Sequence, residues 1–369
     1  MSRQHDPLRF RRRRGAAVTI HDVAARAGVS VATVSRVLNG KELVREETSR
    51  QVLEVAKTLR YVPNVAARTL SIRRSQTIGI VLPEVHGEFF SEVIRGIDLA
   101  ARAAGYHILV SGSHSDANEM IDVLDAMRGR VDGLVVMAPD VALAPLREQL
   151  AHKLPMVLLN SDDQRHATIT IDNYGGARTM MKHLGSLGHT RIAFIKGPEQ
   201  NADARERLRG YRHVMRGLLR GEASAPPVKD LRELEFEGDF TERAGYDAVK
   251  AIVALDPRPT AIFAANDSMA VGALSALAEA GIDVPDGMSL AGFDDIPIAH
   301  YVNPPLTTIG VDIAELGRRA FAVLADAMER SSHTRREECI GTTLVVRRSC
   351  AVPGSRTHKT RGRKKGEGS

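Results

Sequence analysis

The chain has 369 residues, of which 43% are hydrophobic, and this is enough for two or three globular domains. It contains no run of eighteen apolar residues and only two cysteines, which excludes a membrane span and a disulfide framework. The net charge of +6 combines a basic excess of ten in residues 1–76, a basic excess of five in residues 353–369 and an acidic excess of nine in residues 77–352. The basic N-terminal segment predicts contact with a polyanion.

Residues 1–17 include the run RFRRRRGAA and show no apolar periodicity, so we expect a disordered basic leader. The leader lacks the apolar stretch of a signal peptide, which points to a cytoplasmic protein. Its role stays open between an arm that adds non-specific affinity for DNA and a solubilising segment or a start site assigned too early.

A short helix is expected at residues 20–27. Thr19 precedes it and is expected to cap it, with Asp22 three residues later as the second half of a capping box. Gly28 follows the helix and supplies the positive φ of a tight turn. This segment therefore has the pattern of the first helix and turn of a helix-turn-helix.

A second helix is expected at residues 31–39, with Ser30 as its cap. Its spacing puts Val34, Val37 and Leu38 on a buried stripe. The residues left on the open side are Val31, Ala32, Ser35 and Arg36. A helix that is held by one stripe while its N-terminal residues stay open is built like a DNA recognition helix.

A third helix is expected at about residues 45–59. It packs on the first two helices through Val52, Val55, Ala56 and Leu59, which lie on one helical face. The three helices together predict a small all-α domain.

From residue 77 the chain alternates between short β-rich runs and helical stretches. The β-rich runs are TIGIVLP, HILVSGS, GLVVMA, MVLLN, RIAFIKG and TAIFAAND. The helical stretches between them are residues 90–104, 120–128, 175–188 and 268–280. Repeated βα units predict parallel sheets with helices on both faces.

The run HDVAARAGVSVATVSRVLNG, followed by YVPNVAARTLS and later by GFDD and PPLTTI, resembles the LacI/GalR family of transcription regulators over residues 19–346. The resemblance implies a helix-turn-helix DNA-binding domain and an α/β, periplasmic-binding-protein-like effector domain made of two parallel-sheet subdomains. The expected divisions are a leader (1–17), the DNA-binding domain (18–63), a hinge helix and linker (64–76), the effector domain (77–348, with crossovers near 172 and 304) and a disordered basic tail (349–369).

By this resemblance, bases are read mainly by the first two residues of the recognition helix, Val31 and Ala32, and by Arg36. An arginine can bond guanine through two hydrogen bonds, whereas valine and alanine offer apolar contact only. Other polar residues are expected to contact phosphates and to position the helix. The full expected DNA-binding set is Thr19, Ser30, Val31, Ala32, Thr33, Ser35, Arg36, Asn39, Asn64, Ala67, Arg68 and Leu70.

Pro63 ends the third helix, and Asn64 is expected to cap a helix of about seven residues, too short to be stable alone. In the family this hinge helix forms on DNA, and its leucine enters the minor groove. Leu70 holds that position here, with Ala67 and Arg68 alongside. A plain linker is the alternative interpretation.

In a fold of two such halves, the ligand cleft lies at the carboxyl ends of the strands. Phe89 and Phe90 follow the first strand, and Asn160 and Asp172 flank the crossing to the second half. By the resemblance, the family has an effector-contacting arginine at Arg207 and a stacking aromatic residue at Phe240. Asn266 and Asp294 complete the expected effector-binding set. Carboxylates and amides beside aromatic rings predict a sugar-type site, although each residue also has a purely structural interpretation. Many sugar-binding relatives have Asp where this chain has Asn160, so the role of Asn160 is less certain than that of the other residues.

These patterns predict a DNA-binding transcriptional regulator, a repressor of carbohydrate-utilisation genes controlled by a small sugar-type effector. The alternative is a regulator of the same fold that answers to a nucleobase or a partner protein. The helix-turn-helix argues against a transport protein. Since no known catalytic motif is present, we expect no enzyme, no metal site and no cofactor. The tail lacks leucine heptads, so a homodimer on a palindromic operator is expected.

Overall fold

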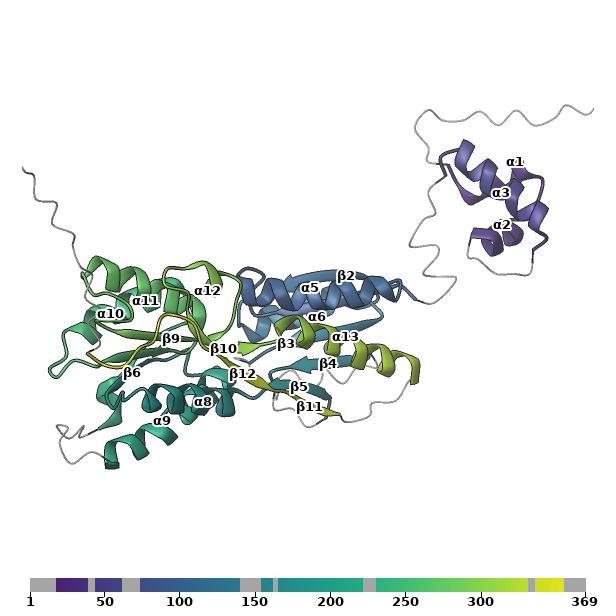
Figure 1. Ribbon diagram of the computed structural model, residues 1–369. Helices are drawn as coiled ribbons and strands as arrows, with labels where there is room; N and C mark the ends of the chain where they lie inside the picture. The colour runs from purple at the N-terminus through teal and green to yellow at the C-terminus, as the bar shows by residue number, and fades with distance from the viewer. Residues whose placement is uncertain are drawn as a thin grey trace, which may run out of the picture. The chain divides into compact units, whose positions relative to one another are not determined.

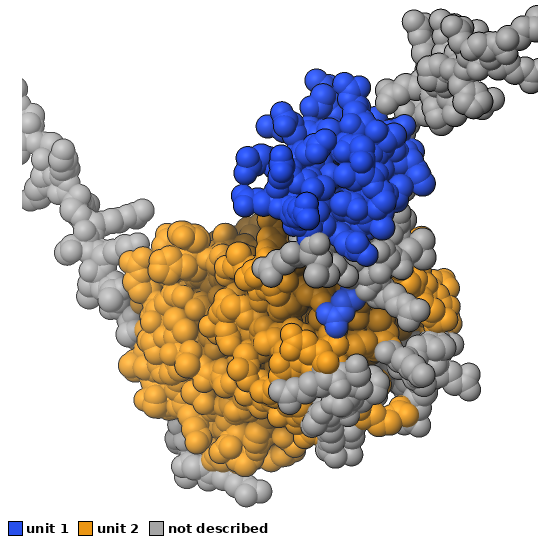
Figure 2. Space-filling model, turned by 90° about the vertical axis from the view of Figure 1, so that its right-hand side faces the viewer, with its two compact units in different colours: residues 1–75 blue, residues 76–369 orange. Residues whose placement is uncertain are grey.

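The computed structural model describes residues 18–38, 44–61, 74–139, 154–161, 165–221, 230–330 and 336–354. The helices and strands are labelled in Figure 1. The chain divides into two compact units, Met1–Ser75 and Gln76–Ser369 (Figure 2). No helix in the described ranges is long and apolar enough to cross a membrane.

The first unit contains the helices α1 (Ile20–Ala27), α2 (Val31–Leu38) and α3 (Glu46–Thr58). The predicted caps are confirmed. The backbone N–H of Thr19 donates to the Asp22 carboxylate at 2.9 Å, and the Thr19 hydroxyl accepts from the Asp22 N–H. Gly28 has φ 64°, and the Ser30 hydroxyl accepts from the backbone N–H of Thr33 at 3.1 Å.

A small apolar core holds these three helices together. Val23, Val34 and Val52, one from each helix, are fully buried in it. Val31 also packs against this core, although the sequence placed it on the open side of the helix. The reason is its position three residues before Val34, which puts both on the same face. Arg45 precedes α3 without capping it through its side chain.

Several expected DNA contacts and both ends of the chain lie outside the described residues. These are Asn39, the hinge residues Asn64, Ala67, Arg68 and Leu70, the leader 1–17 and the tail from residue 355.

The second unit contains two sheets with helices on both faces (Figure 1). In the described chain the first sheet has the order β11-β5-β4-β3-β1-β2, and its pairings are parallel. Its strands are β1 (Thr77–Leu82), β2 (His107–Gly112), β3 (Gly133–Met137), β4 (Met156–Leu159), β5 (Ala167–Ile171) and β11 (Glu337–Ile340). Its helices are α5 (Glu88–Ala103), α6 (Ala117–Met127) and α13 (Ile313–Arg330).

The second sheet has the order β12-β10-β9-β8-β6-β7 over the residues described, and only the β10–β12 pair is antiparallel among its pairings there. Its strands are β6 (Ile192–Ile195), β7 (Glu235–Phe236), β8 (Ala261–Ala264), β9 (Ser289–Asp294), β10 (Thr307–Val311) and β12 (Thr342–Val345). Its helices are α8 (Asn173–Ser186), α9 (Ala202–Gly221), the 3₁₀ helix η1 (Leu231–Leu234), α10 (Glu242–Val253), α11 (Asp267–Glu279) and α12 (Ile298–Tyr301).

The chain crosses between the sheets at Asp172, at Asp312 and again at Gly341, between β11 and β12. The sequence placed the second crossing near residue 304. It lies later because β10 still pairs with β9, so the chain leaves the second sheet only after Val311. The third crossing was not predicted.

Two glycines allow α10 and α11 to pack closely. A Cβ on Gly245 would lie 2.0 Å from the Met269 carbonyl oxygen, and one on Gly272 would lie 1.8 Å from that of Glu242. Any side chain at either position would push the helices apart. Because both helices begin beside the cavity described below, this contact positions part of its wall.

Candidate functional site

The second unit contains a cavity of about 600 Å³ between its two sheets. Seven of the eight predicted effector residues line it: Phe89, Phe90, Asn160, Arg207, Phe240, Asn266 and Asp294. Asp172 does not line it. Its carboxylate accepts a hydrogen bond from the backbone N–H of Gly175 at 2.8 Å, and so caps α8.

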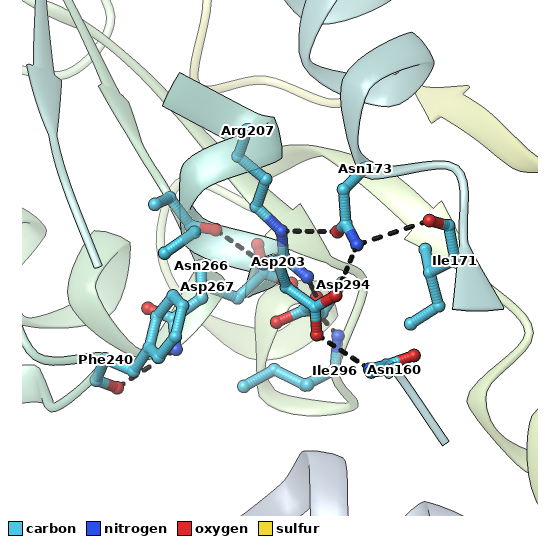
Figure 3. A network of polar contacts seen from close by, with 12 residues as sticks. Asn160, Ile171, Asn173, Asp203, Arg207, Phe240, Asn266, Asp267, Asp294 and Ile296 are labelled. Atoms are coloured by element: carbon cyan, nitrogen blue, oxygen red, sulfur yellow. Dashed lines mark hydrogen bonds and ion pairs between the residues drawn. The ribbon is translucent and has the colours of Figure 1, made fainter. Parts of the chain in front are cut away.

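A buried ion pair lies at the back of the cavity (Figure 3). The guanidinium of Arg207, on α9, lies 2.9 Å from the carboxylate of Asp294, at the end of β9. The same guanidinium donates to the Asn173 side-chain oxygen at 2.7 Å and to the Ala265 carbonyl at 2.6 Å. A buried charge needs such partners, and here they fix the arginine in one position.

Asp203 joins the two halves of the unit, and the sequence did not reveal it. Its carboxylate accepts from the side-chain amide of Asn160 at 2.7 Å and from that of Asn173 at 2.8 Å (Figure 3). Asn160 follows β4 in the first sheet, whereas Asp203 lies on α9 beside the second. Asp203 comes four residues before Arg207, so helical spacing from a known site residue could have identified it.

Asn266 ties the start of α11 to the loop that carries Phe240. Its side-chain oxygen accepts from the Met269 N–H at 2.9 Å and so caps the helix. Its amide donates to the Phe240 carbonyl at 3.0 Å. Asn266 therefore supports the wall of the cavity as well as lining it.

Aromatic rings form the apolar part of the wall. Phe89 and Phe90, in the first turn of α5, are both half-buried and meet edge to face with ring centroids 5.6 Å apart. Phe240 has φ 71°, and its ring centroid lies 5.9 Å from the Arg207 guanidinium carbon. Apolar ring faces beside fixed polar groups suit a ligand with one apolar and one polar face.

Two buried carboxylates lie close together behind the cavity. Burial raises the pKa of Asp267 well above its ordinary value, and the charge of Asp294 raises it further. Burial also raises the pKa of Asp294, against the opposing effect of the Arg207 guanidinium. Asp267 in turn accepts from the Thr308 hydroxyl at 2.6 Å and from the Ile296 N–H at 3.0 Å. The arrangement favours one buried negative charge over two.

On the first unit, Ala32 and Arg36 are exposed one helical turn apart on α2. Val31, Thr33 and Ser35 are half-buried. The exposed strip is therefore narrower than the sequence indicated, and Arg36 is its charged member.

Comparison with known proteins agrees with both units. Residues 19–64 match the family described as bacterial regulatory proteins, lacI family, and residues 181–350 match the periplasmic binding protein-like domain. The HTH-type transcriptional repressor PurR of Vibrio cholerae serotype O1 is 36% identical over 323 residues, which cover 86% of this chain and 94% of that protein. The chain belongs to the LacI family. The transcriptional repressor CytR of Escherichia coli K12 is 33% identical over 90% of this chain and 96% of its own length.

Solved structures of the family confirm the fold. The lac repressor dimer bound to operator and the anti-inducer ONPF has a TM-score of 0.81 at 29% identity, covering 91% of this chain and all of that chain. The complex of the transcriptional regulator CelR with cellobiose has a TM-score of 0.66 at 29% identity, covering 90% of this chain and 99% of that chain. As a LacI-family member, the protein is a DNA-binding transcriptional repressor, and PurR and CytR are repressors rather than enzymes.

Proposed function

We propose that the operator affinity of this repressor is controlled by a small, hydroxyl-rich, sugar-type molecule bound in the cavity. The observation that carries the proposal is the combination of the buried Arg207–Asp294 pair with the rings of Phe89, Phe90 and Phe240, which line the same cavity. Adjacent hydroxyls of a sugar can form hydrogen bonds with fixed carboxylate and guanidinium groups. The apolar face of the sugar ring can stack on an aromatic ring. The likeness to the CelR–cellobiose complex supports this ligand class.

The ligand acts by favouring one arrangement of the two halves. The hydrogen bond between Asn160 and Asp203 joins the halves across the cavity, so a ligand that replaces or reinforces it changes their relative stability. The effect on DNA is limited to the difference in ligand affinity between the two arrangements. The sequence resemblance assigns the transmission of this change to residues 64–76, of which 64–73 lie outside the described residues.

The protein acts as a homodimer on a palindromic operator. Four exposed apolar side chains lie on three elements of the second unit: Leu99 on α5, Leu109 on the edge strand β2, and Ile298 and Tyr301 on α12. The Glu88 carboxylate at the start of α5 accepts from the Ile298 N–H at 2.8 Å, which joins α5 to α12. We take these exposed apolar side chains as candidates for the dimer interface.

The test is operator affinity at fixed salt with and without a panel of mono- and disaccharides. We expect one sugar to change the affinity at least tenfold, equivalent to about 1.4 kcal/mol of coupling. A second candidate, a nucleobase effector, is favoured by the same rings because they can also stack on a planar base. A response to nucleobases and to no sugar would contradict the sugar proposal and support this candidate.

A further inference from the structure

We propose that the effector carries a positive charge, as an amino group on the hydroxyl-rich ligand, and that anionic ligands are excluded. This inference rests on the proposed function, because it names the chemical class of the same effector. Its starting point is the charge of the cavity wall. The described residues that line the cavity include six carboxylates: Glu84, Glu88, Asp203, Asp239, Glu242 and Asp294. Asp294 is neutralised by its ion pair with Arg207, which leaves five.

Positive charge is scarce on the same wall. Arg207 is the only lysine or arginine among the described lining residues, and its side chain is 4% exposed. It is already paired with Asp294 and bonded to Asn173 and Ala265, so its charge is compensated within the protein. His86 also lines the cavity, and its ring nitrogen lies 3.4 Å from the carboxylate of Glu84. An anion entering this cavity therefore meets more negative than positive side-chain charge.

A second observation concerns hydrogen bonding. Asn160 is 3% exposed, and its amide donates to Asp203. Its side-chain oxygen is buried and has no hydrogen-bond partner within the described residues. A buried acceptor left unsatisfied is costly, so a ligand donor that reaches this atom when the two halves move would be favoured. An ammonium group offers three donors and no acceptor, whereas a ligand carboxylate or phosphate offers acceptors only.

The aromatic wall is compatible with a cation. Ring faces attract positive charge, and this fold already uses that attraction, because the Arg207 guanidinium carbon lies 3.9 Å from the Phe293 ring centroid. Phe89, Phe90 and Phe240 line the cavity itself. Carboxylates and rings that line one cavity together match an aminated, hydroxylated ring better than a neutral one.

The experiment compares matched ligands by calorimetry on the full chain, at a pH where the amine is protonated. The ligands are a hexose, its 2-amino derivative, the N-acetylated amide and the uronic acid, in gluco and galacto configurations. The amine is expected to bind at least tenfold more tightly than the hexose and to change operator affinity. The uronic acid is expected to bind more weakly than the hexose, and added salt to reduce the amine's advantage.

Two cavity variants, Glu84→Gln and Glu242→Gln, remove negative charge without changing size. Combined, they are expected to weaken amine binding at least threefold and to leave hexose binding within twofold. Asp283→Asn, an exposed carboxylate that does not line the cavity, is the matched control and should change neither. If the hexose or the uronic acid binds as tightly as the amine and changes operator affinity, the inference is wrong and the proposed function stands. If none of these compounds binds, the inference is wrong, and the wider panel of mono- and disaccharides decides the proposed function.

Discussion

At the scale of single residues, the cavity depends on Arg207. Its three partners come from different parts of the chain: Asp294 at the end of β9, Asn173 at the start of α8 and Ala265 after β8. Such a residue contributes as much to the position of the surrounding elements as to any ligand. Its role in effector binding stays a prediction, while its structural role follows from these contacts.

Removing one member of the Arg207–Asp294 pair is expected to be costly. Asp294→Asn leaves a buried guanidinium uncompensated, which should lower the free energy of unfolding by about 3–5 kcal/mol. Arg207→Gln should have a similar effect, and the double variant should cost clearly less than the sum, because neither charge then remains. Urea unfolding of the full chain measures this. Arg209→Gln, an exposed position on the same helix, is the control, and additive costs would refute the coupling.

Arg36 is the charged member of the exposed strip on α2. If it bonds a base, Arg36→Ala should lose about 1–3 kcal/mol of discrimination between operator and scrambled DNA. Non-specific binding at low salt should persist, because phosphate contacts supply it. Titrations of both DNAs at two salt concentrations measure the difference. Arg50→Ala, an exposed arginine on α3, is the control, and an unchanged operator preference in Arg36→Ala would exclude base reading.

At the scale of elements, local signals account for the helices of the first unit. The capping box of Thr19 and Asp22 begins α1, Gly28 ends it and Ser30 begins α2. All three were readable from the sequence because each acts over only a few residues. Packing against α3 was also predictable, since Val52 and Ala56 are buried on the expected face.

The capping box of α1 offers a direct test at this scale. Thr19→Ala removes the hydroxyl acceptor, so α1 should lose about 1 kcal/mol of stability against opening. Hydrogen exchange of the α1 amides in the full chain should therefore become faster. Thr58→Ala is the matched control. The Thr58 hydroxyl donates to the Glu54 carbonyl near the C-terminal end of α3 and therefore caps no helix start. Equal exchange rates in wild type and Thr19→Ala would show that the Thr19 cap does not stabilise α1.

At the scale of the whole molecule, regulation requires two sheets that share a cavity and are joined by several crossings. Crossings at Asp172, Asp312 and Gly341 join the halves, and the Asn160–Asp203 bond adds a non-covalent link. A change in the angle between the halves would therefore move several of the elements that line the cavity together. This is the arrangement expected of a ligand-controlled switch.

The proposed dimer makes a prediction at the same scale. Tyr301 is 77% exposed and Leu99 is 51% exposed, so a charge at either position should not disturb the core. Tyr301→Asp and Leu99→Glu are expected to give monomers by analytical ultracentrifugation and to weaken binding to a palindromic operator, since each monomer reads one half-site. Val352→Glu, also exposed but on the C-terminal segment, is the control. Dimers that persist in both variants would place the interface elsewhere.

The sequence by itself determined the helix-turn-helix, the alternation of strands and helices, and seven of the residues that line the cavity. The first two depend on local chemistry, namely caps and periodic apolar residues. Among the cavity residues, Phe89, Phe90 and Asn160 follow strands, whereas Arg207 and Phe240 were predicted from the resemblance to the family. Short strands such as β7 and the third crossing were missed because neighbours distant in sequence decide them. The packing of Val31 against the core was missed although its spacing from Val34 would have shown it.

Only the tertiary structure decided which polar groups meet. Asp203 bonds residues 43 and 30 positions away, and Asp172, the expected ligand residue, instead caps its own helix. Spacing along a chain does not show which of several carboxylates lies beside an arginine, because that depends on how two sheets pack around a shared cavity. The negative charge of the cavity wall could not be predicted from the sequence for the same reason, because its six carboxylates come from both halves of the unit.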